Sequence, residues 1–273
     1  MKTNLSYLCS LITAAFFLSS AAAKAQTPDT VFLEELTWTE VRDAIQSGTT
    51  TIILPTAGTE QNGPHMVLGK HKFIINHTSE KIARRLGKAL VAPVMTYVPE
   101  GDLDPPSSHM RFPGTITLPN EHFMKVLEYA ARSFRSHGFT DIVCIGDSGP
   151  NQPGMKEVSE LLNQEWAGEK VRVHFVPEYY SENGFREWLQ AQGETPEAIG
   201  RHAGITDTAQ LMAAAPRHVR DGKRKPGGGF EGSGVIGDPT RASKAYGRKG
   251  IELKVEVVVR RVRELIAKQR TTR

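Results

Sequence analysis

Residues 54–71 read LPTAGTEQNGPHMVLGKH, and this stretch is the most informative part of the chain. It continues an apolar segment, 51–54, that predicts a short buried β-strand. The turn after this strand carries one carboxylate, Glu60, and two imidazoles, His65 and His71. Open α/β sheets place ligand sites at strand ends of this kind, and carboxylates and imidazoles bind divalent zinc, manganese or iron. The stretch therefore predicts a metal or acid–base site; the simpler alternatives are a turn-capping Glu60 and an exposed His71.

Strands and helices alternate along the rest of the chain. Apolar runs predict further strands at 91–98, 141–146 and 171–176. Amphipathic periodicity, with capping residues and glycine stops, predicts the intervening helices at 37–46, 73–90, 120–137, 153–166 and 251–268. Such alternation favours an α/β fold, with a mainly parallel central sheet and helices on both faces in a single domain.

Three further polar stretches carry candidate functional groups. Residues 146–152, GDSGPNQ, directly follow a predicted strand and offer Asp147 as a metal ligand and Ser148 as a substrate contact or nucleophile. A tight βα turn would use the same residue types for their backbone preferences. His109 lies on a loop rich in proline, glycine and serine and is a candidate for substrate contact. His202 and Asp207 stand before a predicted helix, and His202 is a candidate general acid or base because imidazole titrates near neutral pH.

The N-terminus resembles a secretory signal peptide. A short basic start precedes a mostly apolar segment, 5–23, and residues 23–25 form an A-x-A cleavage pattern. We expect residues 1–25 to be removed, so that the mature chain is 26–273 and is periplasmic or secreted. An uncleaved anchor is the alternative, but the apolar segment is short and interrupted by serine and threonine.

Composition narrows the class of partner. The formal charge of +4 falls to about +2 without Lys2 and Lys24. Basic clusters at 217–225 and 260–273 are not interleaved with aromatic residues, so we expect no nucleic-acid partner and no membrane contact after signal cleavage. Residues 227–237 are rich in glycine and suggest a mobile loop, and 269–273 suggest a basic tail. Cys144 is the only mature cysteine, and its apolar neighbours predict a buried strand residue.

Four stretches, in this order, resemble the creatininase (creatinine amidohydrolase) family. That family shows E-Q-H-G-P-H-L-P-L-G-x-D after its first strand, then an H-x-x-F-P-G-T loop, an N-G-H-G-G-N turn and an H-A-G-x-x-E-T-S segment. The corresponding residues here are 60–71, 109–115, 146–151 and 202–209. The resemblance implies a doubly covered α/β fold, often in a hexamer, and a two-metal site, commonly of zinc or manganese. It also implies that Glu60 is a metal ligand and that His202 is the catalytic histidine.

The chain departs from the family pattern where the metals should bind. Asn62 replaces a histidine ligand, and His71 replaces the bridging aspartate. Ser148 stands where the turn has its histidine, and Pro150 occupies another ligand position. An imidazole offers one lone pair to one metal and cannot bridge two as a carboxylate does. We therefore expect a reduced site, with one divalent metal on Glu60, His71 and Asp147 (zinc in the first instance, manganese or iron as alternatives), or no metal at all.

Three functions follow from these residues. The first is an exported amidohydrolase that opens a C–N bond in a small cyclic amide or related substrate. In this hypothesis His202 and Asp207 are catalytic, and the substrate-binding residues are Asn62, His65, His109 and Ser148. The second is a non-catalytic small-molecule-binding protein on the same fold. The third is a metal-free serine hydrolase that uses Ser148 and His202.

Overall fold

The computed structural model describes residues 28–224 and 230–271. A parallel sheet of four strands lies at its centre, in the order β2-β1-β3-β4. The strands are β1 (Thr51–Thr56), β2 (Ala89–Val91), β3 (Asp141–Gly146) and β4 (Arg172–Phe175). The longest pairing joins β1 to β3, from Thr51 opposite Asp141 to Thr56 opposite Gly146. The predicted fold class, a parallel sheet with helices on both faces in one domain, is confirmed.

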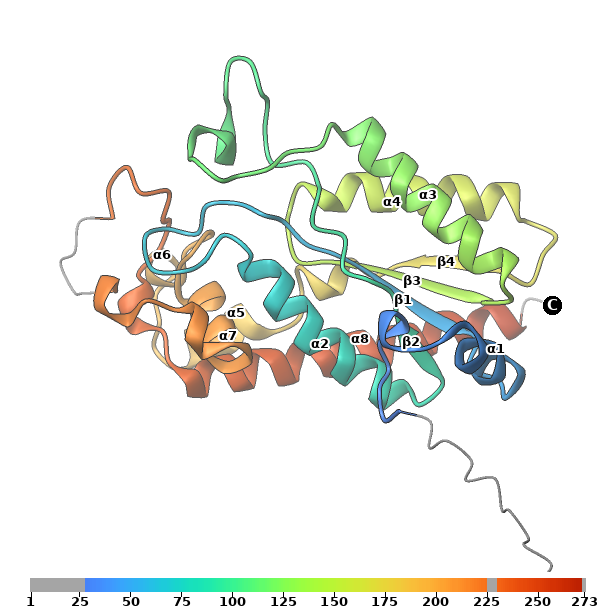
Figure 1. Cartoon of the computed structure of the whole chain (residues 1–273). Helices are drawn as coiled ribbons and strands as arrows, with labels where there is room; N and C mark the ends of the chain where they lie inside the picture. The colour runs from blue at the N-terminus through green and yellow to red at the C-terminus, as the bar shows by residue number, and fades with distance from the viewer. Residues whose placement is uncertain (1–27, 225–229, 272–273) are drawn as a thin grey trace, which may run out of the picture.

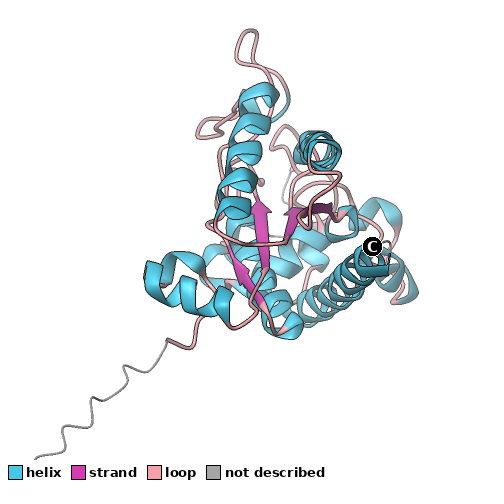
Figure 2. Ribbon diagram, turned by 90° about the vertical axis from the view of Figure 1, so that its right-hand side faces the viewer, coloured by secondary structure: helices cyan, strands magenta, loops and turns pink. Residues whose placement is uncertain are grey.

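Two helical layers cover the sheet (Figure 1). One layer contains α3 (Asn120–Ser136) and α4 (Asn151–Glu165); the other contains α2 (Lys70–Leu86) and the long α8 (Lys244–Thr271). Figure 2 shows the strands enclosed between helices in the perpendicular view. Side chains alternate across the strands. Ile52 and Cys144 belong to the core beneath α3 and α4, whereas Ile53 and Val143 belong to the core against α2 and α8. The predicted burial of Cys144 is thereby confirmed.

The bounds of two predicted elements differ from the structure around Gly87. A helix over 73–90 and a strand over 91–98 were expected, but α2 ends at Leu86 and β2 covers only Ala89–Val91. Gly87 adopts a left-handed conformation, with φ +84°, and its N–H is donated to the Ala83 carbonyl. This is a helix stop that the apolar periodicity concealed, because Leu86 and Leu90 continue the same pattern.

Smaller helices complete the fold. α1 (Trp38–Gln46) begins with a capping box formed by Thr37 and Glu40, close to the predicted helix. α5 (Phe185–Ala191), α6 (Pro196–Ile199) and α7 (Ile205–Ala214) lie together beside α8. Only the last of these three was anticipated, because α5 and α6 are too short for a clear periodic signal.

Several sequence expectations concern the ends and loops. The expected signal peptide, 1–25, lies outside the described residues, as do 225–229 of the glycine-rich loop. In the remainder of that loop, Ile236 forms an antiparallel bridge with His202. α8 extends to Thr271, so residues 269–271 of the expected tail are helical. Within the described ranges, no helix combines the length and apolarity needed to cross a membrane.

The strand order creates a switch point between β1 and β3. The chain leaves β1 through α2 to reach β2 on one side, and returns through α3 to β3 on the other. Loops from the carboxyl ends of two such strands diverge and leave a crevice, where open α/β sheets bind ligands. Glu60 follows β1 and Asp147 follows β3 directly, so the topology brings the first and second sequence motifs to one place.

Candidate active site

A cavity of about 610 Å³ lies at this switch point. Its lining includes residues from all four motifs, with Glu60 and His71 from the first, His109 from the proline-rich loop, Asp147 after β3, and His202 before α7. The cavity therefore unites segments that are far apart in the sequence.

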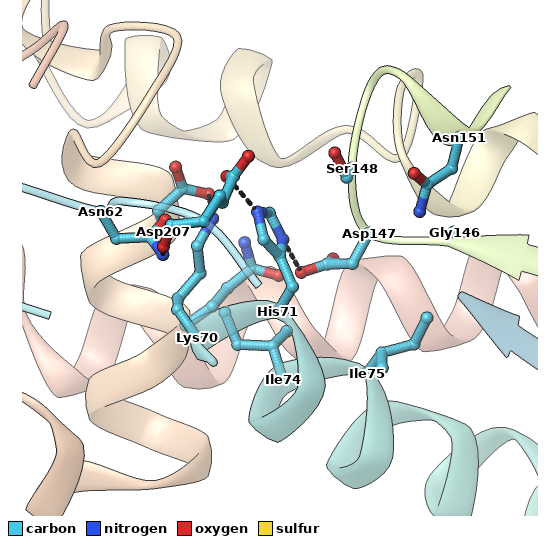
Figure 3. Close-up of polar contacts among 12 residues, drawn as sticks. Asn62, Lys70, His71, Ile74, Ile75, Gly146, Asp147, Ser148, Asn151 and Asp207 are labelled. Atoms are coloured by element: carbon cyan, nitrogen blue, oxygen red, sulfur yellow. Dashed lines mark hydrogen bonds and ion pairs between the residues drawn. The ribbon is translucent and has the colours of Figure 1, made fainter. Parts of the chain in front are cut away.

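His71 lies between two carboxylates. Its Nε2 is 2.6 Å from Glu60 Oε1, and its Nδ1 is 2.9 Å from Asp147 Oδ2. Figure 3 shows a dashed contact at each of the two ring nitrogens, one of them to Asp147. Burial and the charge of Lys70 would lower the pKa of His71, yet the two carboxylates raise it above its usual value. His71 is thus a doubly hydrogen-bonded cation, since carboxylates only accept and both ring nitrogens must donate.

The same contacts hold the two carboxylates ionised. Burial alone would raise the pKa of Glu60, but the charge and hydrogen bond of His71 outweigh it and hold the pKa well below its usual range. Burial is also outweighed at Asp147, where Lys254 and His71 keep the pKa of the carboxyl low. Lys254 Nζ lies 3.0 Å from Asp147 Oδ1. The imidazolium ring therefore separates Glu60 from Asp147, and the expected set of Glu60, His71 and Asp147 has no arrangement in this structure that converges on one metal.

A different triad converges instead. One ligand atom from each of Glu60, His109 and His202 can be chosen so that all three lie within 4.8 Å of one another. His109 Nε2 lies 3.3 Å from Glu60 Oε2, and His202 Nδ1 lies 3.7 Å from Glu60 Oε1. Glu60 Oε2 is buried and makes no hydrogen bond to the described part of the chain. An orphaned carboxylate oxygen facing two imidazoles is a donor set that suits a single divalent cation.

The hydrogen bond of His202 favours this interpretation. His202 Nε2 lies 2.8 Å from the Gln61 carbonyl oxygen, which can only accept, so Nε2 carries the proton and the Nδ1 lone pair faces Glu60. Burial, followed by the charge of Lys70, lowers the pKa of His202 to about 4 and also lowers the pKa of His109. His109 Nδ1 lies 3.1 Å from Gln61 Nε2. Metal binding through His109 Nε2 would require the Gln61 amide to turn its oxygen toward Nδ1.

Lys70 and Asp207 form a second ion pair at the cavity. The Lys70 ammonium is fully buried and lies 3.3 Å from Asp207 Oδ1. Asp207 Oδ2 accepts the N–H of Ala203, 2.7 Å away, and so fixes the turn that carries His202. Burial would raise the pKa of Asp207, but Lys70 and His202 lower it. Asp207 therefore supports the position of His202 from the first turn of α7.

Glu100 is a functional candidate that the sequence reasoning missed. It comes from the proline-rich loop, and its carboxyl lies against Gly58, where a Cβ would overlap the Glu100 Oε1 atom. Burial, followed by the neighbouring Glu60 carboxylate, raises the pKa of Glu100 to about 10, so it is a neutral acid. Lys70 and Lys254 were also missed, because lysines in amphipathic helices ordinarily face solvent. No local pattern signalled any of the three.

Two of the residues predicted to bind substrate do not line the cavity. Asn62 Nδ2 donates to the Glu60 carbonyl oxygen, 2.8 Å away, within its own loop. His65 is fully buried, and its Nε2 lies 2.9 Å from Thr208 Oγ1. Both side chains therefore tie the first motif to its surroundings, Asn62 within the loop and His65 to α7. His109 does line the cavity, where a substrate contact stays a prediction.

Ser148 also lines the cavity, but it lacks a histidine partner. Its Oγ lies 3.4 Å from Glu100 Oε1. Neither nitrogen of His202 forms a hydrogen bond with Ser148 in the described structure, since Nε2 contacts Gln61 and Nδ1 faces Glu60. A serine nucleophile needs a base within hydrogen-bond reach. This geometry gives no support to the serine-hydrolase alternative.

Two known proteins are similar to this chain over more than two thirds of its length. A mycofactocin precursor peptide peptidase of Mycobacterium tuberculosis is 27% identical over 244 residues, 80% of this chain and 86% of that protein. A creatinine amidohydrolase of Pseudomonas putida is 26% identical over 191 residues, 68% of this chain and 72% of that protein.

Solved creatininase structures share the fold. One creatinine amidohydrolase superposes with a TM-score of 0.75 at 21% identity, covering 88% of this chain and 99% of its own. Two others, described as an Mn creatininase and a mutant of Zn-Zn type, reach TM-scores of 0.74 at 21% and 22% identity, covering 87% and 88% of this chain and 99% of their own. The creatininase family profile, described as creatinine amidohydrolase, matches residues 34–262. With the fold, the cavity and this match taken together, the chain belongs to the creatininase family of hydrolases.

Proposed function

We propose that the protein hydrolyses a C–N bond in a small polar amide, with one divalent metal, zinc in the first instance and manganese or iron as alternatives. The triad of Glu60, His109 and His202 at the cavity carries this proposal. Its ligand types suit all three metals, and its place at the β1/β3 switch point is where the fold binds ligands.

The side chains around the triad have distinct tasks in this proposal. A divalent metal held by Glu60, His109 and His202 would supply Lewis acidity toward an amide carbonyl. The Lys70 ammonium lines the cavity, and none of its N–H groups is hydrogen-bonded to the described residues. It can therefore donate to a substrate oxygen, while Asp207 holds it in place. His71 fixes the orientation of Glu60, as a partner outside the metal site does for a ligand.

His202 has two candidate tasks that one experiment separates. As a ligand it would offer its Nδ1 lone pair; as a general acid or base it would move a proton to the leaving nitrogen. His202→Ala and His109→Ala should both abolish turnover if both residues are ligands, and both should lower the bound zinc measured by mass spectrometry. If His202→Ala loses turnover at full zinc content, its task is proton transfer. Unchanged turnover in both variants would contradict the proposed site.

The substrate class is proposed from the relatives together with the cavity. The names of the two relatives point to a cyclic amide and a peptide, so both classes belong in the screen. Arg111 and Arg201 line the cavity with exposed side chains, which favours substrates that carry a carboxylate. We expect turnover of a cyclic amide or short peptide in the presence of zinc, and none with Glu60→Gln. Failure of every amide with fully metallated protein would contradict an amidohydrolase.

A non-catalytic binding protein is the second candidate, and a specific observation favours it. His71 and Lys254 already neutralise the carboxylate that follows β3, and Pro150 offers no ligand there. A binder would show ligand-induced increases in Tm with no product by mass spectrometry. The same ligand panel, incubated with the metallated protein, distinguishes the two candidates directly.

Export and assembly are further parts of the proposal. We propose that the mature protein starts at Gln26, is periplasmic or secreted, and forms a homo-oligomer, a hexamer by the family resemblance. The A-x-A pattern at 23–25 supports the first point. The intact mass of the exported protein tests the cleavage, and an unprocessed N-terminus would contradict it. Light scattering tests the assembly, and a monomer at micromolar concentration would contradict the homo-oligomer.

A further inference from the structure

Three cations of the chain itself lie at the candidate active site. Lys70 is 0% exposed and Lys254 is 4% exposed, so neither is an ordinary surface lysine. His71 is 5% exposed. Burying a charge is costly unless it is paired, and each of these side chains has a carboxylate partner in the site.

Each of the three buried cations is paired with at least one carboxylate. Lys70 faces Asp207 at 3.3 Å, His71 bonds to both Glu60 and Asp147, and Lys254 faces Asp147 at 3.0 Å. Three carboxylates are thus matched by three cations. Each of these three carboxylates therefore already has a cationic partner before any metal binds.

We infer that Lys70, His71 and Lys254 supply, as fixed charge in the chain, the positive charge that a second divalent metal would bring, so that the site takes at most one metal. In a Zn-Zn site anionic ligands join two cations; here His71 is a cation that joins two anions. Lys254 and the His71 ring both lie within hydrogen-bond distance of the Asp147 carboxylate. A second metal near Asp147 would therefore be repelled by both cations, and this repulsion is strong where water is excluded. This inference rests on the proposed metal site and refines its stoichiometry.

The first test is the zinc stoichiometry of the full mature protein. The apoprotein is titrated with zinc chloride by calorimetry, and bound metal is measured by mass spectrometry after gel filtration. The inference predicts one zinc per chain. Two zinc ions per chain would overturn it. No bound zinc would contradict the metal-assisted hydrolysis proposed above, and the charge-changing variants below would then decide the inference, so the two proposals fail on different results.

A charge-changing variant tests the cause. His71→Asp removes the cation between Glu60 and Asp147 and adds a carboxylate; His122→Asp makes the same change at an exposed position on α3. Since the variant replaces a buried cation with a carboxylate at the metal site, we expect zinc affinity to rise at least about tenfold in His71→Asp. The control should show no change in zinc affinity. One zinc at unchanged affinity in a folded His71→Asp protein would overturn the inference.

If His71→Asp does not fold without metal, a second variant applies the same test. Lys70→Met removes one buried cation with little change in length, and Lys72→Met removes an exposed cation two residues away on the same helix. Zinc should raise the Tm of Lys70→Met by more than it raises that of the wild type or of Lys72→Met. Equal zinc-induced shifts in all three proteins would count against the charge-replacement argument.

Discussion

At the scale of single residues, His65 shows how a histidine can be part of the site without touching the cavity. It is fully buried, and its Nδ1 has no hydrogen-bond partner within the described residues. Burial, followed by the positive charge of Arg224, lowers the pKa of His65 to about 4. Protonation would place an unpaired charge beneath the loop that carries Glu60, so this histidine links the integrity of the site to pH.

The stability of the protein should therefore fall in acid in a way that depends on His65. The pKa of His65 is lower in the folded state than in the unfolded state. The contribution of neutral His65 to stability is therefore complete above about pH 6.5 and is lost as pH falls toward 4. Chemical denaturation at several pH values should show that the free energy of unfolding falls less steeply with decreasing pH in His65→Gln than in the wild type. The two slopes should differ by at most about 1.4 kcal/mol per pH unit. His122→Gln, at an exposed position, should keep the wild-type slope; a wild-type slope in His65→Gln would contradict this role.

At the scale of secondary-structure elements, the end of α2 allows the chain to enter β2 beside β1. α2 begins with Lys70 and His71 and must stop in time for the chain to enter β2 beside β1. Gly87 provides that stop with a positive φ angle, and no atom lies within 4 Å of where its Cβ would be. The requirement for glycine is thus conformational rather than steric.

Replacing Gly87 with alanine should cost about 1–2 kcal/mol of unfolding free energy, because a side chain disfavours the left-handed region by that amount. The matched control is Gly168→Ala, where a Cβ also meets nothing within 4 Å but φ is not in the left-handed region. Thermal and urea denaturation should separate the two variants. Equal stability of both would show that the α2 stop tolerates a side chain.

At the scale of the whole molecule, two separate hydrophobic layers hold the sheet in position. On the α3 and α4 side, Leu127 is 1% exposed within the core, while its neighbour Val126 is 48% exposed. The active-site motifs sit at the carboxyl edge of the strands and depend on both layers, since β1 and β3 contribute to each.

Leu127→Ala should therefore lower the free energy of unfolding by about 2–5 kcal/mol through lost burial and a residual cavity. Val126→Ala, the adjacent position on the same helix, should change it by no more than about 0.5 kcal/mol. Urea denaturation with a common m-value gives both numbers. A small loss in Leu127→Ala would mean that α3 does not pack on the sheet as described.

The sequence by itself determined the fold class and the place of the site. The alternation of apolar strands and amphipathic helices is a local signal, and β1, β3, α1 and α3 lie within a few residues of their predicted bounds. Polar motifs directly after β1 and β3 could be assigned to one sheet edge, because the carboxyl ends of parallel strands share it.

Only the tertiary structure decided the partners within the site. Glu60 converges with His109 and His202 rather than with His71 and Asp147, and two buried lysines, Lys70 and Lys254, come from positions that look solvent-exposed in sequence. The pairing of Lys254 with Asp147 spans 107 residues, and that of His202 with Gln61 spans 141. Such contacts depend on how helices and loops pack, and burial then determines which groups are charged; neither quantity is encoded in local residue patterns.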